Sequence, residues 1–284
     1  MRLSSPLTLV WVVLVPISAD WGTPAQKAEA VAYHSAFELM QSKLERDVAR
    51  IWAQSLKFTD YQQQRIFLTN MLWDLQQVYG GDATALAAEY LNFLRDGADL
   101  PMVEAGAAVV DEVSAAVGVS LASKEPSVVL QGSMQRLMMN AYRDTMMGSA
   151  VAAERRFARV AEPGACSFCL MLASRGAVYL SKNQASFVGA GGLRRHYSDG
   201  SFRGYRVKKG VVRGSRPSGA KFHDHCRCHV VEVADDSELP ESNKWLQEAW
   251  GEATSGVDGM KEKQAAWAEW LSKNSVPWEP SRAA

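Results

Sequence analysis

Apolar residues recur at helical spacing from about residue 25 onward. In the first such segment they are three or four positions apart, which places them on one face of a helix. The opposite positions hold charged side chains such as Glu38, Lys43 and Arg46. The pattern therefore predicts a long amphipathic helix whose buried face is formed by Tyr33, Phe37, Met40, Leu44, Val48 and Ile51.

Two more helices are predicted from capping residues and from the same periodicity. Thr59-Asp60 offers an N-cap, and the apolar positions that follow lead to Gly80-Gly81, where we expect this helix to end. Asp82 would then cap a third helix, which stops at Gly97.

Another long helix should open at Pro126, because proline is favoured in the first turn. Its apolar periodicity leads us to expect that it continues to Val160, just before the helix-breaking Glu162-Pro163-Gly164. This helix is rich in methionine, a residue that fills irregular gaps in cores. We expect a core position for Met134, Met138, Met139, Met146 and Met147.

The pattern changes between 163 and 233, where glycines and turn dipeptides separate short β-prone pieces such as Val230–Val233. After Asp235-Asp236 the chain reads as helical again and is rich in tryptophan. These large side chains must pack on this protein or on a neighbour. They are Trp245, Trp250, Trp267, Trp270 and Trp278.

The expected fold class is therefore mainly α (α+β). We expect a helical body at 26–160, a loop-rich Cys/His module with short strands and a basic loop at 161–235, and a Trp-rich helical tail at 236–284. We expect residues 1–25 to be a leader, or to result from a start codon assigned too far upstream. Composition agrees with a globular protein, since 47% of the 284 residues are hydrophobic and 22% are charged.

The N-terminal segment leaves its role open. Leu7–Ile17 is strongly apolar behind a single Arg2, and Ile17-Ser18-Ala19 is a passable cleavage site. This is a weak secretory signal and too short for a membrane span. A buried apolar segment and a start codon assigned too far upstream are the alternatives.

All four cysteines lie between 166 and 228, next to a cluster of histidines. Cys166 and Cys169 form a Cys-x-x-Cys turn, and the second group is His223-Asp-His225-Cys226-Arg-Cys228-His229. A Cys-x-x-Cys turn places two thiolates at adjacent corners of a tetrahedron, and structural zinc takes four S or N ligands. The spacing predicts a structural zinc site built on Cys166 and Cys169.

The remaining ligands are open at this point. Cys226 and Cys228 can complete the site, or His223 with one of these two cysteines, and a surplus histidine can orient a ligand instead. Two disulfides are the alternative if the protein is exported, and four inert thiols are another. A metal-dependent nuclease or toxin using His223 or His225 is the catalytic alternative; a closed set of four ligands argues against it, so we expect no enzyme.

The segment between the two ligand clusters is strongly basic. Over 194–221 there are nine basic residues and one acid, Asp199, although the whole chain is balanced at 31 basic and 31 acidic residues. Aromatic residues are interleaved with the basic ones. One interpretation is that this segment binds nucleic acid without sequence specificity. The other interpretation is a solvated basic loop. The basic residues are Arg194, Arg195, Arg203, Arg206, Lys208, Lys209, Arg213, Arg216 and Lys221.

The module resembles that of a known family. The residues that carry the resemblance are Arg159-Val160, the run Cys166-Ser-Phe-Cys169-Leu-Met-Leu-Ala-Ser-Arg-Gly-Ala-Val-Tyr179, and His223-Asp-His-Cys226-Arg-Cys228. They are similar to the phage Mu protein F-like minor capsid (head morphogenesis) proteins of tailed phages, above all of actinobacteriophages. The front end also looks like that family, for instance at Leu86–Arg95, and the resemblance covers roughly residues 28 to 235.

The resemblance implies a head protein made in the bacterial cytoplasm and located in the virion, inside the capsid near the portal. It implies a role in head assembly and DNA packaging without enzymatic activity. The implied partners are the portal protein or the major capsid protein and, through the basic loop, packaged double-stranded DNA; no membrane is implied. A reducing cytoplasm favours zinc over disulfides.

Overall fold

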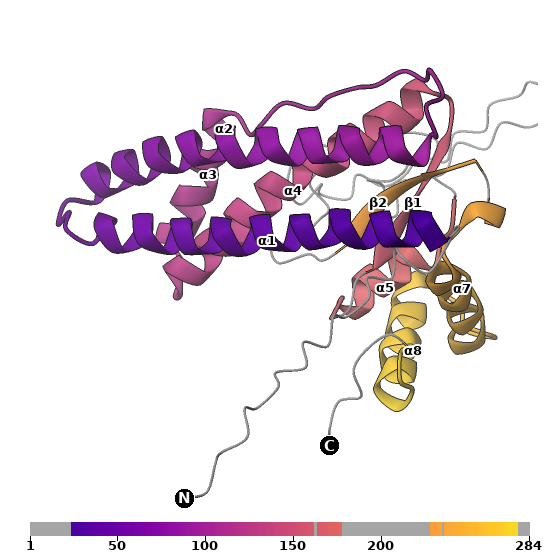
Figure 1. The fold of residues 1–284 in the computed structure, drawn as a ribbon. Coiled ribbons are helices and arrows are strands. Elements are labelled where there is room, and N and C mark those ends of the chain that lie inside the picture. The colour runs from indigo at the N-terminus through magenta and orange to yellow at the C-terminus, as the bar shows by residue number, and fades with distance from the viewer. Residues whose placement is uncertain (1–23, 162–163, 178–227, 235, 278–284) are drawn as a thin grey trace, which may run out of the picture.

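The computed structural model describes residues 24–161, 164–177, 228–234 and 236–277. Two long helices, α1 (Pro24–Ser55) and α2 (Tyr61–Leu94), lie side by side and antiparallel (Figure 1). Helices α3 (Val110–Leu121) and α4 (Pro126–Ala152) pack against α2, and α4 also contacts α1. This arrangement confirms the mainly α fold class.

The start of α2 follows the predicted capping. Asp60 has extended backbone angles, and its carboxylate accepts a hydrogen bond of 2.8 Å from the Gln63 backbone N–H. Such a cap satisfies one of the donors that the first helical turn leaves unpaired. Between the two helices, the Tyr79 hydroxyl donates to Asp47 at 2.7 Å. The predicted apolar stripe of α1 is also confirmed, with buried Phe37, Leu44, Val48 and Ile51.

The expected end of this helix at Gly80-Gly81 is wrong, because α2 continues without a break to Leu94. Gly80 is buried against the 99–109 segment; a Cβ at this position would lie 2.8 Å from the Ala107 Cβ. The glycine is therefore required by close packing and not by a helix end. Asp82 lies inside the same helix, so the predicted second cap and third helix merge into α2.

The 99–109 segment runs back along α2 to α3 (Figure 1). Side chains of α2 and α4 satisfy part of its backbone in place of strand partners. Ser149 accepts from the Val103 N–H at 2.9 Å, and Thr145 accepts from the Ala105 N–H at 3.0 Å. Thr84 donates to the Ala105 carbonyl at 2.8 Å. A non-repetitive segment is thus held between helices without leaving these groups unpaired.

The predicted start of α4 at Pro126 is confirmed, and the five methionines of this helix are buried at 2% exposure or less. The expected continuation to Val160 is wrong, since α4 ends at Ala152. Glu154 adopts a positive φ of 53°, and the Arg155 N–H returns to the Ala150 carbonyl at 2.8 Å. This is the Schellman geometry that usually requires glycine. Because residue 154 is glutamate and not glycine, no local sequence signal predicts the end of α4.

The residues after this turn form a two-stranded antiparallel ribbon. Strand β1 (Arg156–Ala161) pairs with β2 (Cys228–Val233) in a register that runs from Arg156 opposite Val233 to Ala161 opposite Cys228. All positions except Arg156 are buried. An isolated pair of strands is marginally stable in water, so the helices packed on this ribbon supply its stability. The predicted β-prone piece at 230–233 is confirmed.

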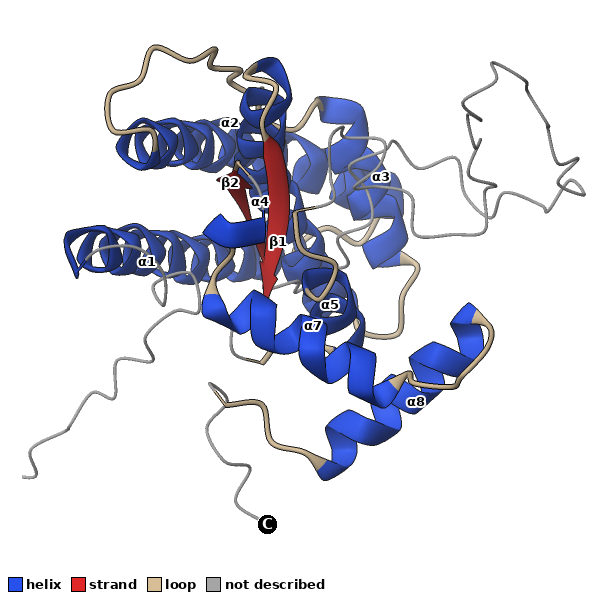
Figure 2. Cartoon of the chain, turned by 90° about the vertical axis from the view of Figure 1, so that its right-hand side faces the viewer, coloured by secondary structure: helices blue, strands red, loops and turns tan. Residues whose placement is uncertain are grey.

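The remaining elements cover one end of the ribbon. The short helix α5 (Ser167–Ala173) contacts β1 and lies between the ribbon and the C-terminal helices α7 (Glu241–Ala253) and α8 (Met260–Lys273) (Figure 2). A single 3-10 turn, Asp236–Glu238, precedes α7. Helices α7 and α8 contact each other and are called the C-terminal hairpin below. Its tryptophans pack on the chain itself, and Trp267 is 1% exposed.

Candidate metal centre at the end of the ribbon

The ribbon topology places Cys228 beside the end of β1, from which the chain continues to the Cys-x-x-Cys turn. Because the strands are antiparallel, the end of β1 at Ala161 lies beside the start of β2 at Cys228. The chain leaves β1 and reaches α5 within a few residues, with Cys166 as the N-cap of that helix. Cysteines that are remote in sequence therefore lie at one end of one ribbon.

The three described cysteines differ in their exposure. Cys166 is exposed, whereas Cys169 is 1% exposed and Cys228 is fully buried. Cys169 and Cys228 belong to the same hydrophobic cluster as the helical body. The Cys-x-x-Cys turn thus lies at the border between core and surface, and its soft thiolate donors are those that zinc prefers.

A buried arginine holds the backbone at Cys228. Arg143 of α4 is 0% exposed, and its Nε and one terminal nitrogen donate to the Cys228 carbonyl at 3.0 and 2.8 Å. Arg143 was not among the residues predicted for the site. Its signal was a charged residue on the apolar stripe of α4, one turn from Met139 and Met146. A buried charge must be hydrogen-bonded, so the bonds to the Cys228 carbonyl explain how Arg143 is accommodated in the core.

Buried polar groups also fix both ends of α5. The Trp267 indole N–H donates to the Ser167 carbonyl at 2.9 Å, within the Cys-x-x-Cys turn. The Asn243 amide, at 0% exposure, donates to the Ala173 carbonyl at 2.9 Å and to the Arg159 carbonyl of β1 at 2.7 Å. The turn, the strand and the C-terminal hairpin are therefore joined as one unit.

The ring of His229, one of the surplus donors of the second cluster, packs among aromatic side chains of the helical body. Successive side chains of a strand point to opposite faces, so His229 and Cys228 diverge. The His229 ring packs 5.4 Å from both His34 and Phe37 and 5.7 Å from Tyr142, measured between ring centroids. These rings line a small pocket between α1, α2, α4 and β2. The His229 ring therefore lies on the other face of β2 from Cys228.

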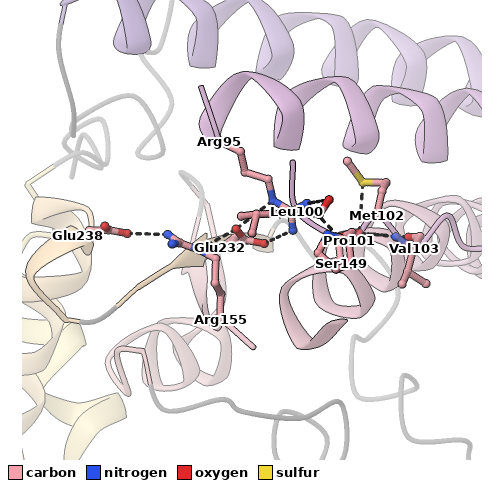
Figure 3. A network of polar contacts seen from close by, with 9 residues as sticks. All are labelled: Arg95, Leu100, Pro101, Met102, Val103, Ser149, Arg155, Glu232 and Glu238. Atoms are coloured by element: carbon pink, nitrogen blue, oxygen red, sulfur yellow. Dashed lines mark hydrogen bonds and ion pairs between the residues drawn. The ribbon is translucent and has the colours of Figure 1, made fainter. Parts of the chain in front are cut away.

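A second polar network joins the ribbon to the helical body (Figure 3). Glu232 of β2 receives two contacts from Arg95, the C-cap of α2, at 3.1 and 2.6 Å. Arg155 approaches the same carboxylate at 2.8 Å and reaches Glu238 at 3.2 Å. The side chains of Arg95 and Glu232 are 3% and 2% exposed. This network fixes the position of β2, and with it the position of Cys228.

Several predicted site residues lie outside the described residues. These are His223, Cys226 and the whole basic loop from Arg194 to Lys221. Within the ranges that the structure describes, no group of three or more His, Cys, Asp and Glu side chains is arranged to hold a metal ion. The zinc site therefore stays a prediction, with Cys166, Cys169 and Cys228 as its described part.

Comparison with known proteins gives the chain a family. The family described as VG15 protein matches residues 24–253, from the first residue of α1 to the last residue of α7. No curated protein and no solved structure gave a significant match. In the part of the chain that is described, no helix is long and apolar enough to cross a membrane. The chain belongs to the VG15 protein family, a phage-associated family of viral gene proteins.

Proposed function

We propose that this protein is a structural minor capsid protein, located in the phage head near the portal and acting in head assembly and DNA packaging without catalysis. The observation that carries the proposal is the VG15 match from α1 to α7, which makes the chain phage-associated. The resemblance of the Cys/His segments to Mu protein F-like proteins supports the finer role.

We propose further that a structural zinc ion cross-links the module. Cys166 and Cys169 would supply two ligands, and Cys228, Cys226 and His223 are the candidates for the others. A closed set of S and N ligands supplies folding energy and leaves no open position for a substrate. The arrangement is supported by the position of Cys228 at the end of the ribbon from which the chain leads into the Cys-x-x-Cys turn.

The zinc site is tested on protein purified under reducing conditions. Elemental analysis should give about one zinc per chain, and a thiol titration should find every cysteine reduced. Four oxidised cysteines without metal would contradict the site and favour the disulfide alternative.

The assembly role is tested on particles of a phage that encodes this chain. Quantitative mass spectrometry of purified heads should find the protein at low copy number, and labelling should place it at the portal vertex. Absence from heads with normal assembly in a deletion phage would contradict the proposal. Purified protein should also leave plasmid DNA and RNA intact; cleavage that needs both metal and His223 would show an enzyme instead.

A further inference from the structure

The carbonyl of Ser167 is the point at which the C-terminal hairpin contacts the Cys-x-x-Cys turn. Ser167 lies between the two cysteines, and its carbonyl accepts a hydrogen bond of 2.9 Å from the Trp267 indole, 100 positions further along the chain. Trp267 is 1% exposed whereas Ser167 is exposed, so this bond lies at the edge of the buried region. Trp267 belongs to α8, beyond the residues that the family match covers.

Other aromatic rings of α7 and α8 pack around this indole. Trp270 stacks on Trp267 with an interplanar angle of 10° and a centroid distance of 5.6 Å. Trp250 meets Trp267 edge-on at 5.5 Å, and Trp245 lies 5.8 Å from Trp270. Stacked and edge-on pairs of this kind are favourable arrangements of aromatic rings. Trp267 is therefore packed inside an aromatic cluster, and its own N–H is the group that bonds to the turn.

The hairpin also fixes the opposite end of α5. Asn243 of α7 donates to the Ala173 carbonyl at the end of that helix, while Trp267 of α8 bonds to its first residue. A short helix held at both ends has little freedom to rotate or shift. The backbone that carries Cys166 and Cys169 is therefore held by contacts with α7 and α8.

We propose that Trp267 is a positioning residue for the metal centre, and that zinc binding at the Cys-x-x-Cys turn and docking of α8 stabilise each other. This inference rests on the proposed zinc site. The hydrogen bond of Trp267 orders the backbone between two ligands, as groups outside the ligand shell do in other metal sites. Since coupling between two binding events is reciprocal, zinc must strengthen the docking of α8 as much as α8 strengthens zinc binding.

The test compares Trp267→Phe with Trp270→Phe in the full chain. Phe at 267 keeps an aromatic ring but loses the N–H donor; Phe at 270 weakens the stack and keeps that donor. Zinc affinity is measured by competition with a chromophoric chelator, and thermal unfolding of the metal-free proteins is measured in parallel. We expect Trp267→Phe to lose about 10- to 100-fold in zinc affinity. Trp270→Phe should lower the unfolding temperature but change zinc affinity by less than about threefold.

A second measurement uses the unaltered chain, in case Trp267→Phe does not fold. Zinc addition should slow amide hydrogen exchange in residues 260–273 of α8, with residues 61–75 of α2 as the unchanged reference. Equal zinc affinity of a folded Trp267→Phe protein, or zinc binding without any effect on α8, would overturn the inference. A wild-type chain that binds no zinc would instead contradict the proposed metal centre, and this inference with it.

Discussion

Arg95 and Glu232 are 137 positions apart in the chain and form a buried ion pair through two contacts of 3.1 and 2.6 Å (Figure 3). The same guanidinium donates to the carbonyls of Leu100 and Pro101 at 3.3 and 3.0 Å. One side chain therefore links the end of α2, the 99–109 segment and strand β2. Because Arg155 also contacts Glu232, a single carboxylate faces two guanidinium groups.

Glu232→Gln should destabilise the protein strongly. The substitution leaves the buried Arg95 without its counter-charge, and breaking a buried pair from one side costs about 3–5 kcal/mol. The free energy of unfolding is measured with a chemical denaturant. Glu238→Gln is the matched control, because its carboxylate is 48% exposed and also contacts Arg155; its expected cost is below about 1 kcal/mol. Similar losses for both variants would refute the role of the buried pair.

The adjacent glycines of α2 should respond in opposite directions to alanine. A Cβ at Gly80 would meet the Cβ of Ala107 at 2.8 Å and its Cα at 3.1 Å, so the 99–109 segment must shift. We expect Gly80→Ala to cost about 1–3 kcal/mol. A Cβ at Gly81 meets nothing within 4 Å, so Gly81→Ala should gain about 0.5–1 kcal/mol from helix propensity. Thermal unfolding of both variants measures the difference, and an equal response would contradict the packing argument.

Asn243→Ala should loosen α5 and the C-terminal hairpin together. The substitution removes the donor for two buried carbonyls, those of Arg159 and Ala173. The Ala173 carbonyl keeps a long hydrogen bond of 3.5 Å from the Gly176 N–H, so we expect a loss of about 1–3 kcal/mol for the two lost bonds. The exposed Asn274, which donates to the Trp270 carbonyl, is the control. Denaturation of both alanine variants measures the effect; an Asn243→Ala protein as stable as the Asn274→Ala protein would disprove the prediction.

Neighbouring residues of β2 should differ in their effect on zinc content. Cys228→Ser removes a proposed ligand and should reduce the zinc content well below that of the wild type. His229→Phe alters a ring that packs with His34, Phe37 and Tyr142 on the other face, so its zinc content should match that of the wild type. Elemental analysis of both proteins measures their zinc content. Zinc lost only from His229→Phe would reverse the ligand assignment.

The basic loop lies outside the described residues, so its prediction rests on the sequence. Reversal of Arg203, Arg206, Lys208 and Lys209 to Glu should weaken retention of double-stranded DNA. The effect should be largest at low salt, because phosphate contacts release counterions. Filter binding over a salt series measures it. Unchanged binding at every salt concentration would exclude the loop as a DNA contact.

The periodicity of the sequence was sufficient for the helices whose boundaries depend on local signals. Asp60 and Pro126 mark helix starts because a cap or a fixed φ acts within one turn. The ends were harder to predict. Gly80 looked like a terminator but serves close packing, and Glu154 ends α4 in a conformation that glutamate rarely adopts.

In the candidate site, the sequence likewise predicted the residues that depend on local spacing and not those that depend on distant partners. The Cys-x-x-Cys spacing identifies Cys166 and Cys169 directly, because two ligands of one ion must be close along the chain or brought together by the fold. The supporting residues Arg143, Asn243 and Trp267 act through partners far away in sequence. Arg143 carried a signal as a charge on an apolar helical face, and Trp267 carried one as a member of the tryptophan-rich tail, but nothing in the sequence indicated their partners.

The sequence by itself determined where the long helices at 24, 61 and 126 begin and which side chains can bind a soft metal, because both properties depend on residues within a few positions of each other. The tertiary structure decided that Cys228 and His229 point to opposite faces, that Glu232 meets Arg95, and that the tryptophans cover α5. These relationships depend on strand register and on shape complementarity between distant segments. Neither is encoded in any local pattern of residues.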